Sequence, residues 1–333
     1  MLTRTDKLGD FMLVWPALAL LRASLPAARI DVLVGPAGVQ ISQLCRYVDN
    51  VLVDHGQPVG EIADVIKGNK YDAALSFFVN RRAAAALWVG RVPFRLAPAT
   101  KIYQVLFHGR QVQRRSKSLM PEYEYNIDLV RALLRHYGRV VPQVPSGPYL
   151  EFPCECLDQR LKEVETTYGF SNGAKLIVIH PGSGGSARNM TPERYAWLAG
   201  KISEFGDCFF LITAGPGEEG VALSVNDAIE SAPSAVHFSN RGIEKFAQLI
   251  AVSDVFISGS TGPLHVAGAL NVNTVGFYPR RQSSTALRWQ TINSPSKRLA
   301  FSPPAWAGED DMDAIDLTLA ASIIGEKYLC GSE

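Results

Sequence analysis

The chain has 333 residues, which is long for one domain and suits two. Its apolar share of 47% and charged share of 20% are typical of a globular protein, and its net charge of +1 excludes a protein that binds nucleic acid through overall positive charge. No apolar run is long enough to span a bilayer, the first residues lack the features of a signal peptide, and the five cysteines have no metal-ligand spacing. We therefore expect a cytoplasmic protein with free thiols, no transmembrane segment, no metal or other cofactor, and no nucleic-acid partner.

The first half of the chain alternates short apolar runs with amphipathic ones. Residues 1–5 leave room for only a very short first strand, and the spacing over 11–25 predicts a helix that Pro16 kinks. Further strands are expected at 30–34, 51–53 and 73–78, and further helices at 83–89 and 123–137. Residues 92–95 lead into another extended segment. This alternation indicates βαβ units and a mainly parallel sheet.

The second half follows the same pattern after a segment at 138–153 that is rich in proline and glycine. Strands are expected at 176–180, 207–213, 235–238, 254–258 and 273–278, and helices at 157–168, 192–204, 218–230, 243–252, 262–270 and 313–328. The prediction is an α/β protein with two doubly wound, Rossmann-like domains that face a central cleft, at 1–153 and 154–312, followed by a final segment at 313–333. Ligands of such sheets bind at the carboxyl ends of the strands.

Two turns in the second half combine a buried strand, a glycine-rich loop and a helix start. One is His180-Pro181-Gly182-Ser183-Gly184-Gly185-Ser186-Ala187-Arg188-Asn189, and the other is Ser258-Gly259-Ser260-Thr261-Gly262-Pro263-Leu264-His265. Free backbone N–H groups and the positive end of a helix dipole suit a phosphate there, with Arg188 as a cation and His265 on the rim of the pocket. The same residues also fit two ordinary helix starts with a solvated arginine and a packed histidine. The first turn is neither a Walker A loop nor a G-x-S-x-G nucleophile turn.

Two acids have both a structural and a functional interpretation. Asp10 is either an N-cap or a general base at the mouth of the first sheet, and the two roles are compatible. Glu218, after the turn at 215–217, is either a ribose ligand or a favourable acid in the first turn of a helix.

A basic set in the first half has three interpretations. Arg81, Arg82, Lys101 and Arg114, the last two from a basic stretch at 101–117, form a solvated face or hold the phosphates of an acidic acceptor. Because that stretch also contains Tyr103, Leu106 and Phe107, apposition to a membrane surface is a further alternative.

Three motifs together resemble the lipopolysaccharide heptosyltransferase family (glycosyltransferase family 9). They are Arg4-Thr5-Asp6-Lys7-Leu8-Gly9-Asp10, then His180-Pro181-Gly182-Ser183 with Arg188 and Thr191-Pro192-Glu193-Arg194-Tyr195, and then Ser260-Thr261-Gly262-Pro263-Leu264-His265 through Ala269-Leu270 to Thr274-Val275-Gly276. Their order and spacing span roughly residues 1–280. Ser260 stands where some members have Asp, Arg188 where most have Lys, and Met190 where an aromatic residue is frequent.

The resemblance implies a GT-B architecture, with an acceptor-binding domain, a nucleotide-sugar-binding domain, and a C-terminal helix that packs back on the first domain. It implies inverting, metal-independent transfer of a heptose from ADP-heptose to a lipid-linked lipopolysaccharide inner-core acceptor. The protein would then be cytoplasmic, either free or peripheral on the cytoplasmic face of the inner membrane. By matching position, Asp10 is the expected base and Arg188 contacts the diphosphate, together with Gly182, Ser183, Gly184, Ser260, Thr261, Gly262 and His265, while Glu218 binds the ribose.

Other functions remain open on the residues alone. One alternative is another GT-B enzyme with a different nucleotide-sugar, either a glycosyltransferase or an epimerase. A second is a nucleotide-sugar-binding protein without catalytic activity. A dinucleotide oxidoreductase is disfavoured because Gly35-Pro36-Ala37-Gly38 is only a fragment of the G-x-G-x-x-G fingerprint.

Overall fold

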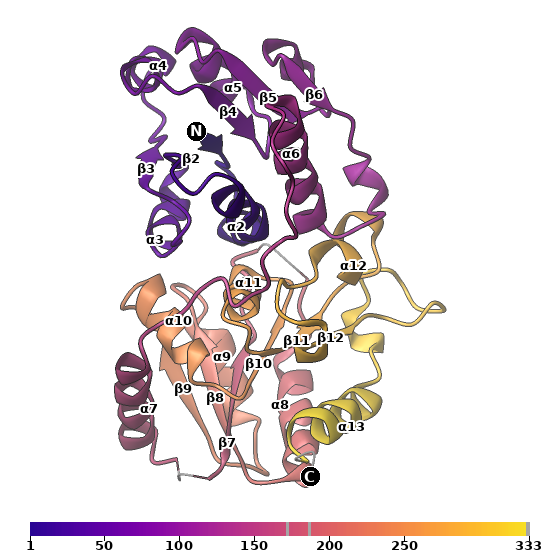
Figure 1. Ribbon diagram of the computed structural model, residues 1–333. Coiled ribbons are helices and arrows are strands. Elements are labelled where there is room, and N and C mark those ends of the chain that lie inside the picture. Colours follow the sequence, from indigo (N-terminus) through magenta and orange to yellow (C-terminus); the bar gives the residue numbers. More distant parts are fainter. Residues whose placement is uncertain (171–172, 186–187, 331–333) are drawn as a thin grey trace. The chain divides into compact units, whose positions relative to one another are not determined.

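The computed structural model describes residues 1–170, 173–185 and 188–330 (Figure 1). The chain divides into two compact units, Met1–Tyr149 and Leu150 onward, and each has its own sheet. The division falls within the expected proline-rich segment, slightly before the expected boundary at residue 153.

The first unit has a parallel sheet of six strands in the order β3-β2-β1-β4-β5-β6. The chain enters at β1 in the middle, moves outward to one side, and then returns to the other side of β1 with β4. The gap between β1 and β4 is therefore the topological switch point, where the connections leave in opposite directions. The strands are β1 (Leu2–Thr3), β2 (Asp31–Val34), β3 (Asn50–Val53), β4 (Ala73–Ser76), β5 (Phe94–Pro98) and β6 (Gly109–Gln111).

Helices cover this sheet, and α2 packs against α6 while α4 packs against α5 (Figure 1). The expected helix over 11–25 is two helices that break at Leu13 and Val14. Pro16 lies in the first turn of the second, where its missing N–H has no helical partner, so it begins a helix instead of kinking one. The helices are α1 (Leu8–Met12), α2 (Trp15–Ser24), α3 (Val39–Gln43), α4 (Val59–Gly68), α5 (Arg81–Val89) and α6 (Glu122–His136), with 3₁₀ turns η1 (Pro36–Gly38), η2 (Ile102–Leu106) and η3 (Arg115–Lys117).

The second unit repeats the strand order with β12-β11-β10-β7-β8-β9, and its switch point lies between β7 and β10. Its middle strands are long apolar runs because helices bury them on both faces. The strands are β7 (Lys175–His180), β8 (Cys208–Ala214), β9 (Ser234–Phe238), β10 (Val255–Gly259), β11 (Asn273–Phe277) and β12 (Arg298–Phe301). The expected fold class of two Rossmann-like sheets is confirmed.

The last helix belongs to the second unit. Its apolar face, which includes Ile324, is buried in a core shared with α8, and Gly325 lets the ring of Phe205 pack directly on the helix backbone. This helix therefore forms part of the second unit's own core, and the expectation that 313–333 packs back on the first domain stays a prediction. The helices of this unit are α7 (Cys154–Tyr168), α8 (Pro192–Ile202), α9 (Glu219–Asp227), α10 (Ile243–Ala251), α11 (Gly262–Ala269), α12 (Ala286–Trp289) and α13 (Leu317–Tyr328), with 3₁₀ turns η4 (Ser203–Phe205), η5 (Gln282–Ser284), η6 (Pro295–Lys297) and η7 (Met312–Ala314).

Two further findings concern the whole described chain. Over residues 1–170, 173–185 and 188–330, no helix is both long and apolar enough to cross a bilayer. All five cysteines are free thiols.

Candidate functional site

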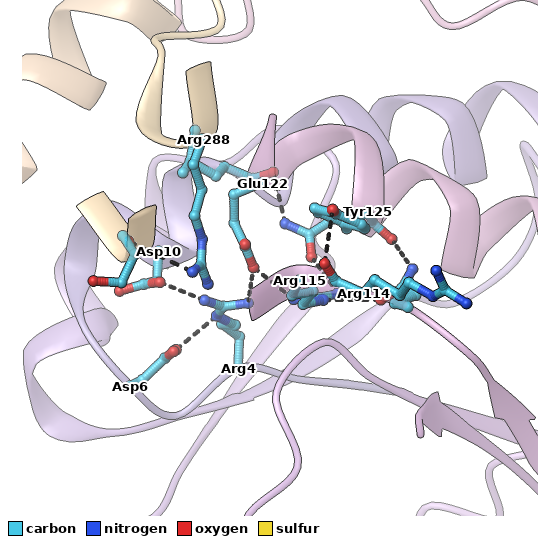
Figure 2. A network of polar contacts seen from close by, with 12 residues as sticks. Arg4, Asp6, Asp10, Arg114, Arg115, Glu122, Tyr125 and Arg288 are labelled. Atoms are coloured by element: carbon cyan, nitrogen blue, oxygen red, sulfur yellow. Dashed lines mark hydrogen bonds and ion pairs between the residues drawn. The ribbon is translucent and has the colours of Figure 1, made fainter. Parts of the chain in front are cut away.

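The switch point of the first unit carries a buried cluster of charges around Arg4 (Figure 2). Arg4 follows β1 directly and only 3% of its side chain is exposed. Its Nε donates to Asp6 Oδ1 over 2.7 Å and its Nη2 to Asp10 Oδ1 over 2.5 Å, and its Nη1 lies 3.9 Å from Glu122 Oε1. One buried guanidinium thus holds three carboxylates at the carboxyl end of the central strand.

Asp10 lies in the first turn of α1, where the N-cap position belongs to Lys7. The N-cap interpretation of Asp10 is therefore wrong, and its side chain turns to Arg4 instead. Burial raises the pKa of Asp10, the charges of Asp6 and Glu122 raise it further, and Arg4 opposes them. A carboxylate with a raised pKa is a better proton acceptor than an ordinary one, which favours the base interpretation.

Glu122 is also held by a set of polar contacts that starts from Arg115. Arg115 donates from Nη1 to Glu122 Oε1 over 2.6 Å and from Nε to Gln113 Oε1 over 2.8 Å. Asn126 also accepts from Arg115, over 3.3 Å, and donates to the Leu13 carbonyl between α1 and α2. These contacts tie α6 to the segment that carries Asp10, so the position of the acid depends on both helices.

Asn80 occupies the other side of the switch point, after β4. Its Oδ1 accepts from the Ala83 N–H over 2.8 Å as the N-cap of α5, and its Nδ2 donates to Thr5 Oγ1 over 2.5 Å. One side chain therefore caps a helix and holds the loop that precedes α1.

The expected acceptor-binding cations have different environments. Arg81, Lys101 and Arg114 are exposed, and the Lys101 ammonium lies 4.2 Å from the centre of the Phe78 ring. These three remain available to a ligand. Arg115, which also belongs to the basic stretch at 101–117, is buried against Glu122 and fits none of the three interpretations of that stretch.

Arg82 is already committed within the fold. Its guanidinium donates to both Asp54 carboxylate oxygens, over 3.0 and 2.7 Å, and to the Gln57 carbonyl over 2.6 Å. The hydrogen bonds from Arg82 lower the pKa of Asp54. The Arg82 side chain therefore holds the loop that follows β3, a structural role that the sequence did not indicate.

In the second unit, the two glycine-rich turns follow neighbouring strands, since His180 of β7 pairs with Ser258 of β10. Thr261 is the N-cap of α11, yet its hydroxyl lies 3.0 Å from Ser258 Oγ and makes no capping hydrogen bond. Pro263 lies in the first turn. Within the described part of the chain, the N-cap side chain therefore leaves the first amides of α11 without a capping acceptor, which is the arrangement that an anion at a helix N-terminus needs.

The loop after β7 lies against this helix start. Asn189 donates from its side chain to the Pro181 carbonyl, and its side-chain oxygen occupies the space where Gly259 would carry a Cβ. This brings the backbone at Arg188 and Asn189 beside the end of β10, two residues before Thr261. The side chain of Arg188 is exposed, and Ser186 and Ala187 lie outside the described residues.

Glu218 contacts the loop that is expected to hold phosphate. Its Oε1 accepts from the Gly184 N–H over 2.6 Å, and its Oε2 lies 3.7 Å from His180 Nε2. Gly182 has no space for a side chain because the carboxylate occupies it, and Gly184 has a φ of +52°, which favours glycine. Glu218 is the N-cap residue of α9, so it precedes the first turn in which we expected it.

Two histidines of this edge are buried and neutral. Burial lowers the pKa of His180 to about 4, and its Nδ1 lies 3.0 Å from Thr213 Oγ1. Burial likewise lowers the pKa of His265 to about 4, and its Nδ1 has no hydrogen-bond partner in the described part of the chain. His265 is only 3% exposed, so it is packed in the interior of the second unit. The expectation that it lies on the rim of a pocket is therefore wrong.

The sequence did not identify Arg4, Glu122, Asn80 or Asn189 as organising residues. The one available signal was Glu122, an acid that opens a helix after a long stretch without acids. In the described ranges, no three His, Cys, Asp or Glu side chains lie together as candidate metal ligands.

Comparisons with known proteins identify the family of the chain. The family model of glycosyltransferase family 9 (heptosyltransferase) matches residues 62–297. A protein of Haemophilus influenzae, named as a candidate glycosyltransferase, is 40% identical over 307 residues, which are 91% of this chain and 88% of that protein.

Two solved structures share the fold along 98% of both chains. The Escherichia coli ADP-heptose lipopolysaccharide heptosyltransferase II aligns with a TM-score of 0.77 at 16% identity. The E. coli heptosyltransferase WaaC with ADP-2-deoxy-2-fluoro heptose aligns with a TM-score of 0.70 at 15% identity. This likeness establishes the GT-B fold, and the family model with the Haemophilus relative establishes more: the chain belongs to glycosyltransferase family 9 and is a glycosyltransferase.

Proposed function

We propose that this glycosyltransferase moves a heptose from ADP-heptose to a saccharide acceptor of the lipopolysaccharide inner core, with inversion and without a metal. The family description and the nucleotide-sugar analogue named with the E. coli enzyme support the donor. The observation that carries the proposal is the pair of turns at the β7–β10 switch point, where, among the described residues, the N-cap Thr261 makes no capping hydrogen bond to the first amides of α11.

The donor diphosphate binds these turns in our proposal. The amides of 182–185 and 261–262 donate to its oxygens, the hydroxyls of Ser183 and Ser260 add donors, and Glu218 accepts from the ribose. Thr261 contributes its amide, because its hydroxyl is buried beside Ser258. Arg188 provides a cation, in a planar fork that fits two phosphate oxygens. We place His265 behind this site as a packing residue of α11, because it is buried.

Asp10 acts as the base. It takes the proton of an acceptor hydroxyl, whose oxygen then attacks the anomeric carbon while the bond from that carbon to the β-phosphate oxygen breaks. Attack from the face opposite the leaving group inverts the anomeric centre. Base catalysis of this kind contributes about 10²- to 10⁴-fold to the rate.

Negative charge that develops on the leaving ADP is stabilised by fixed dipoles and Arg188. Loss of one such donor typically lowers kcat by about 10²- to 10³-fold. Because these groups suffice in the proposal, chelation with EDTA should leave the rate unchanged. The exposed Arg81, Lys101 and Arg114 would hold acidic groups of a lipid-linked acceptor at the cytoplasmic face of the inner membrane.

A donor panel tests the proposal. Calorimetry with ADP, UDP and GDP identifies the nucleotide, and transfer from ADP-heptose to a soluble inner-core fragment tests the reaction. Asp10→Asn should abolish transfer and retain ADP binding, Arg188→Ala should weaken both, and Asp64→Asn on the exposed face of α4 should change neither.

Each other outcome has a defined meaning. Binding of UDP but not ADP would assign a different nucleotide-sugar, and interconversion of a nucleotide-sugar without an acceptor would identify an epimerase. ADP binding without transfer to any acceptor would indicate a binding protein. Normal turnover in Asp10→Asn would exclude Asp10 as the base.

A further inference from the structure

One stretch of the first unit has an extreme charge bias. The 49 residues from Ala73 to Pro121 contain nine Lys or Arg and no Asp or Glu, although the whole chain has a net charge of only +1. Three of the nine are used inside the fold: Arg82 binds Asp54, Arg115 binds Glu122, and the buried Arg95 donates to the Leu106 and Val92 carbonyls. The other six are exposed: Arg81, Arg91, Lys101, Arg110, Arg114 and Lys117.

Large apolar side chains are exposed among these cations. Ile102 is 76% exposed, Val105 67%, Val112 78% and Leu119 67%. The first two lie in η2, after β5, and the other two lie after β6. Because β5 and β6 are parallel neighbours and the Ala99 N–H donates to the Gln111 carbonyl over 2.7 Å, both segments leave the same edge of the sheet (Figure 1).

These apolar side chains are held outward by the fold. Phe107 is buried and Leu106 is half-buried, and both pack on the core beneath α5. Arg95 binds the Leu106 carbonyl, which fixes the end of η2. Two of the three residues named for the membrane alternative, Leu106 and Phe107, are thus anchored in the core, whereas Tyr103 is exposed together with Ile102 and Val105.

We infer that this surface docks on an anionic phospholipid bilayer. We call it the docking surface and define it by Ile102, Val105, Val112, Leu119, Arg114 and Lys117. Cations attract an anionic headgroup layer while apolar side chains insert at its boundary, so the two kinds of residue reinforce each other. A second copy of the chain is a poor occupant, because two surfaces with cations and no acids repel each other.

The docking surface adjoins the candidate base. It lies at the carboxyl edge of the sheet that also carries Asp10. Arg115, the neighbour of Arg114 in the chain, binds Glu122, and Arg4 contacts both Glu122 and Asp10. Docking therefore presents this edge to lipid-linked molecules. The role of docking in acceptor delivery rests on the proposed function, whereas binding of the docking surface to a bilayer does not.

Vesicle co-sedimentation of the full chain without substrates tests the inference. We expect binding to vesicles of phosphatidylcholine and phosphatidylglycerol in equal parts, loss of binding at high salt, and weak binding to phosphatidylcholine alone. Arg114→Gln with Lys117→Gln should weaken binding by about 25-fold, at roughly fivefold for each cation. Ile102→Ser with Val112→Ser should weaken it by at least about tenfold.

Matched variants control for charge and apolar exposure elsewhere. Arg91→Gln removes an exposed cation of the same acid-free stretch that precedes β5, at the amino edge of the sheet, and Val140→Ser removes an exposed apolar side chain outside the surface. Both should bind vesicles as the parent chain does. The inference is overturned if the parent binds neither vesicle or both equally, if the controls lose as much binding, or if light scattering shows that the surface instead joins two chains.

A transfer assay separates this inference from the proposed function. Ile102→Ser with Val112→Ser should retain the full rate on a soluble acceptor fragment and lose rate on acceptor embedded in anionic vesicles. Absence of transfer in every chain would contradict the proposed function and leave the vesicle result standing.

Discussion

Replacing Arg4 by methionine should destabilise the first unit and change the pH dependence of transfer. Methionine fills similar space without charge, so it leaves Asp10, Asp6 and Glu122 buried around an apolar side chain. Removal of one partner of a buried ion pair costs about 3–5 kcal/mol. An independent estimate, for charge centres about 4 Å apart at an effective dielectric constant of 20, is about 4 kcal/mol. The two agree and equal a large part of a typical total stability of about 5–15 kcal/mol.

The pH dependence follows from the sign of the shift. Because the pKa of folded Asp10 is raised, folding takes up a proton, and the contribution of this acid to stability falls as pH rises from its unfolded pKa through its folded one. Arg4 opposes the shift, so Arg4→Met raises the pKa further. The acid limb of kcat/KM should then move to higher pH by about one to three units.

Denaturant unfolding from neutral pH down to about pH 4, with pH–rate profiles, checks both effects. The stability deficit of Arg4→Met should shrink at low pH, because a protonated Asp10 no longer needs a cation. Arg4→Lys, which keeps the charge, should show a smaller deficit and a smaller displacement of the limb. A deficit below about 1 kcal/mol at neutral pH, or an unmoved limb, would refute the assignment of Arg4 as the residue that holds Asp10 ionised.

Two further substitutions test the second unit. Gly182→Ala places a methyl group against the Glu218 carboxylate and should weaken ADP binding at least about tenfold by calorimetry. The control Gly220→Ala, whose methyl group enters open space in α9, should leave ADP binding unchanged and add about 0.5–1 kcal/mol of stability. Ile324→Ala should cost about 2–5 kcal/mol in denaturant unfolding because α13 is part of this core, while the exposed Leu319→Ala should stay within about 0.5 kcal/mol. Equal effects within either pair would contradict the packing described.

The elements that sequence predicted best are those with long apolar runs. The strands at the middle of the second sheet, such as β8 and β10, are buried on both faces, and their pattern is therefore continuous. The edge strands β6 and β12 have no such run, because half of their environment is solvent, and neither was predicted. The break between α1 and α2 was missed because buried apolar residues continue from Phe11 to Leu21 without a polar interruption.

In the candidate site, too, the sequence predicted local features better than features that depend on distant contacts. Loops recognisable from glycine and hydroxyl residues were located correctly, since local composition alone indicates a turn. Residues whose role depends on distant partners were not. Arg82 and Arg115 looked like free cations, and only the fold brings Asp54 and Glu122 to them. The burial of His265 depends on the packing of α11, which no local signal reveals.

The two units share one strand order, and the chemistry after their switch-point strands differs. The first places fixed charges there, which suit proton transfer because their mutual burial sets a pKa. The second places dipoles there: no Asp, Glu, Lys or Arg occurs from Val255 to Pro279, so backbone amides supply most of the positive potential. The Gly184 amide already binds an anion, the carboxylate of Glu218, over 2.6 Å. If a diphosphate binds as we propose, it replaces one anion by another at this amide, which lowers the net gain of binding and frees Glu218 to accept hydrogen bonds from sugar hydroxyls.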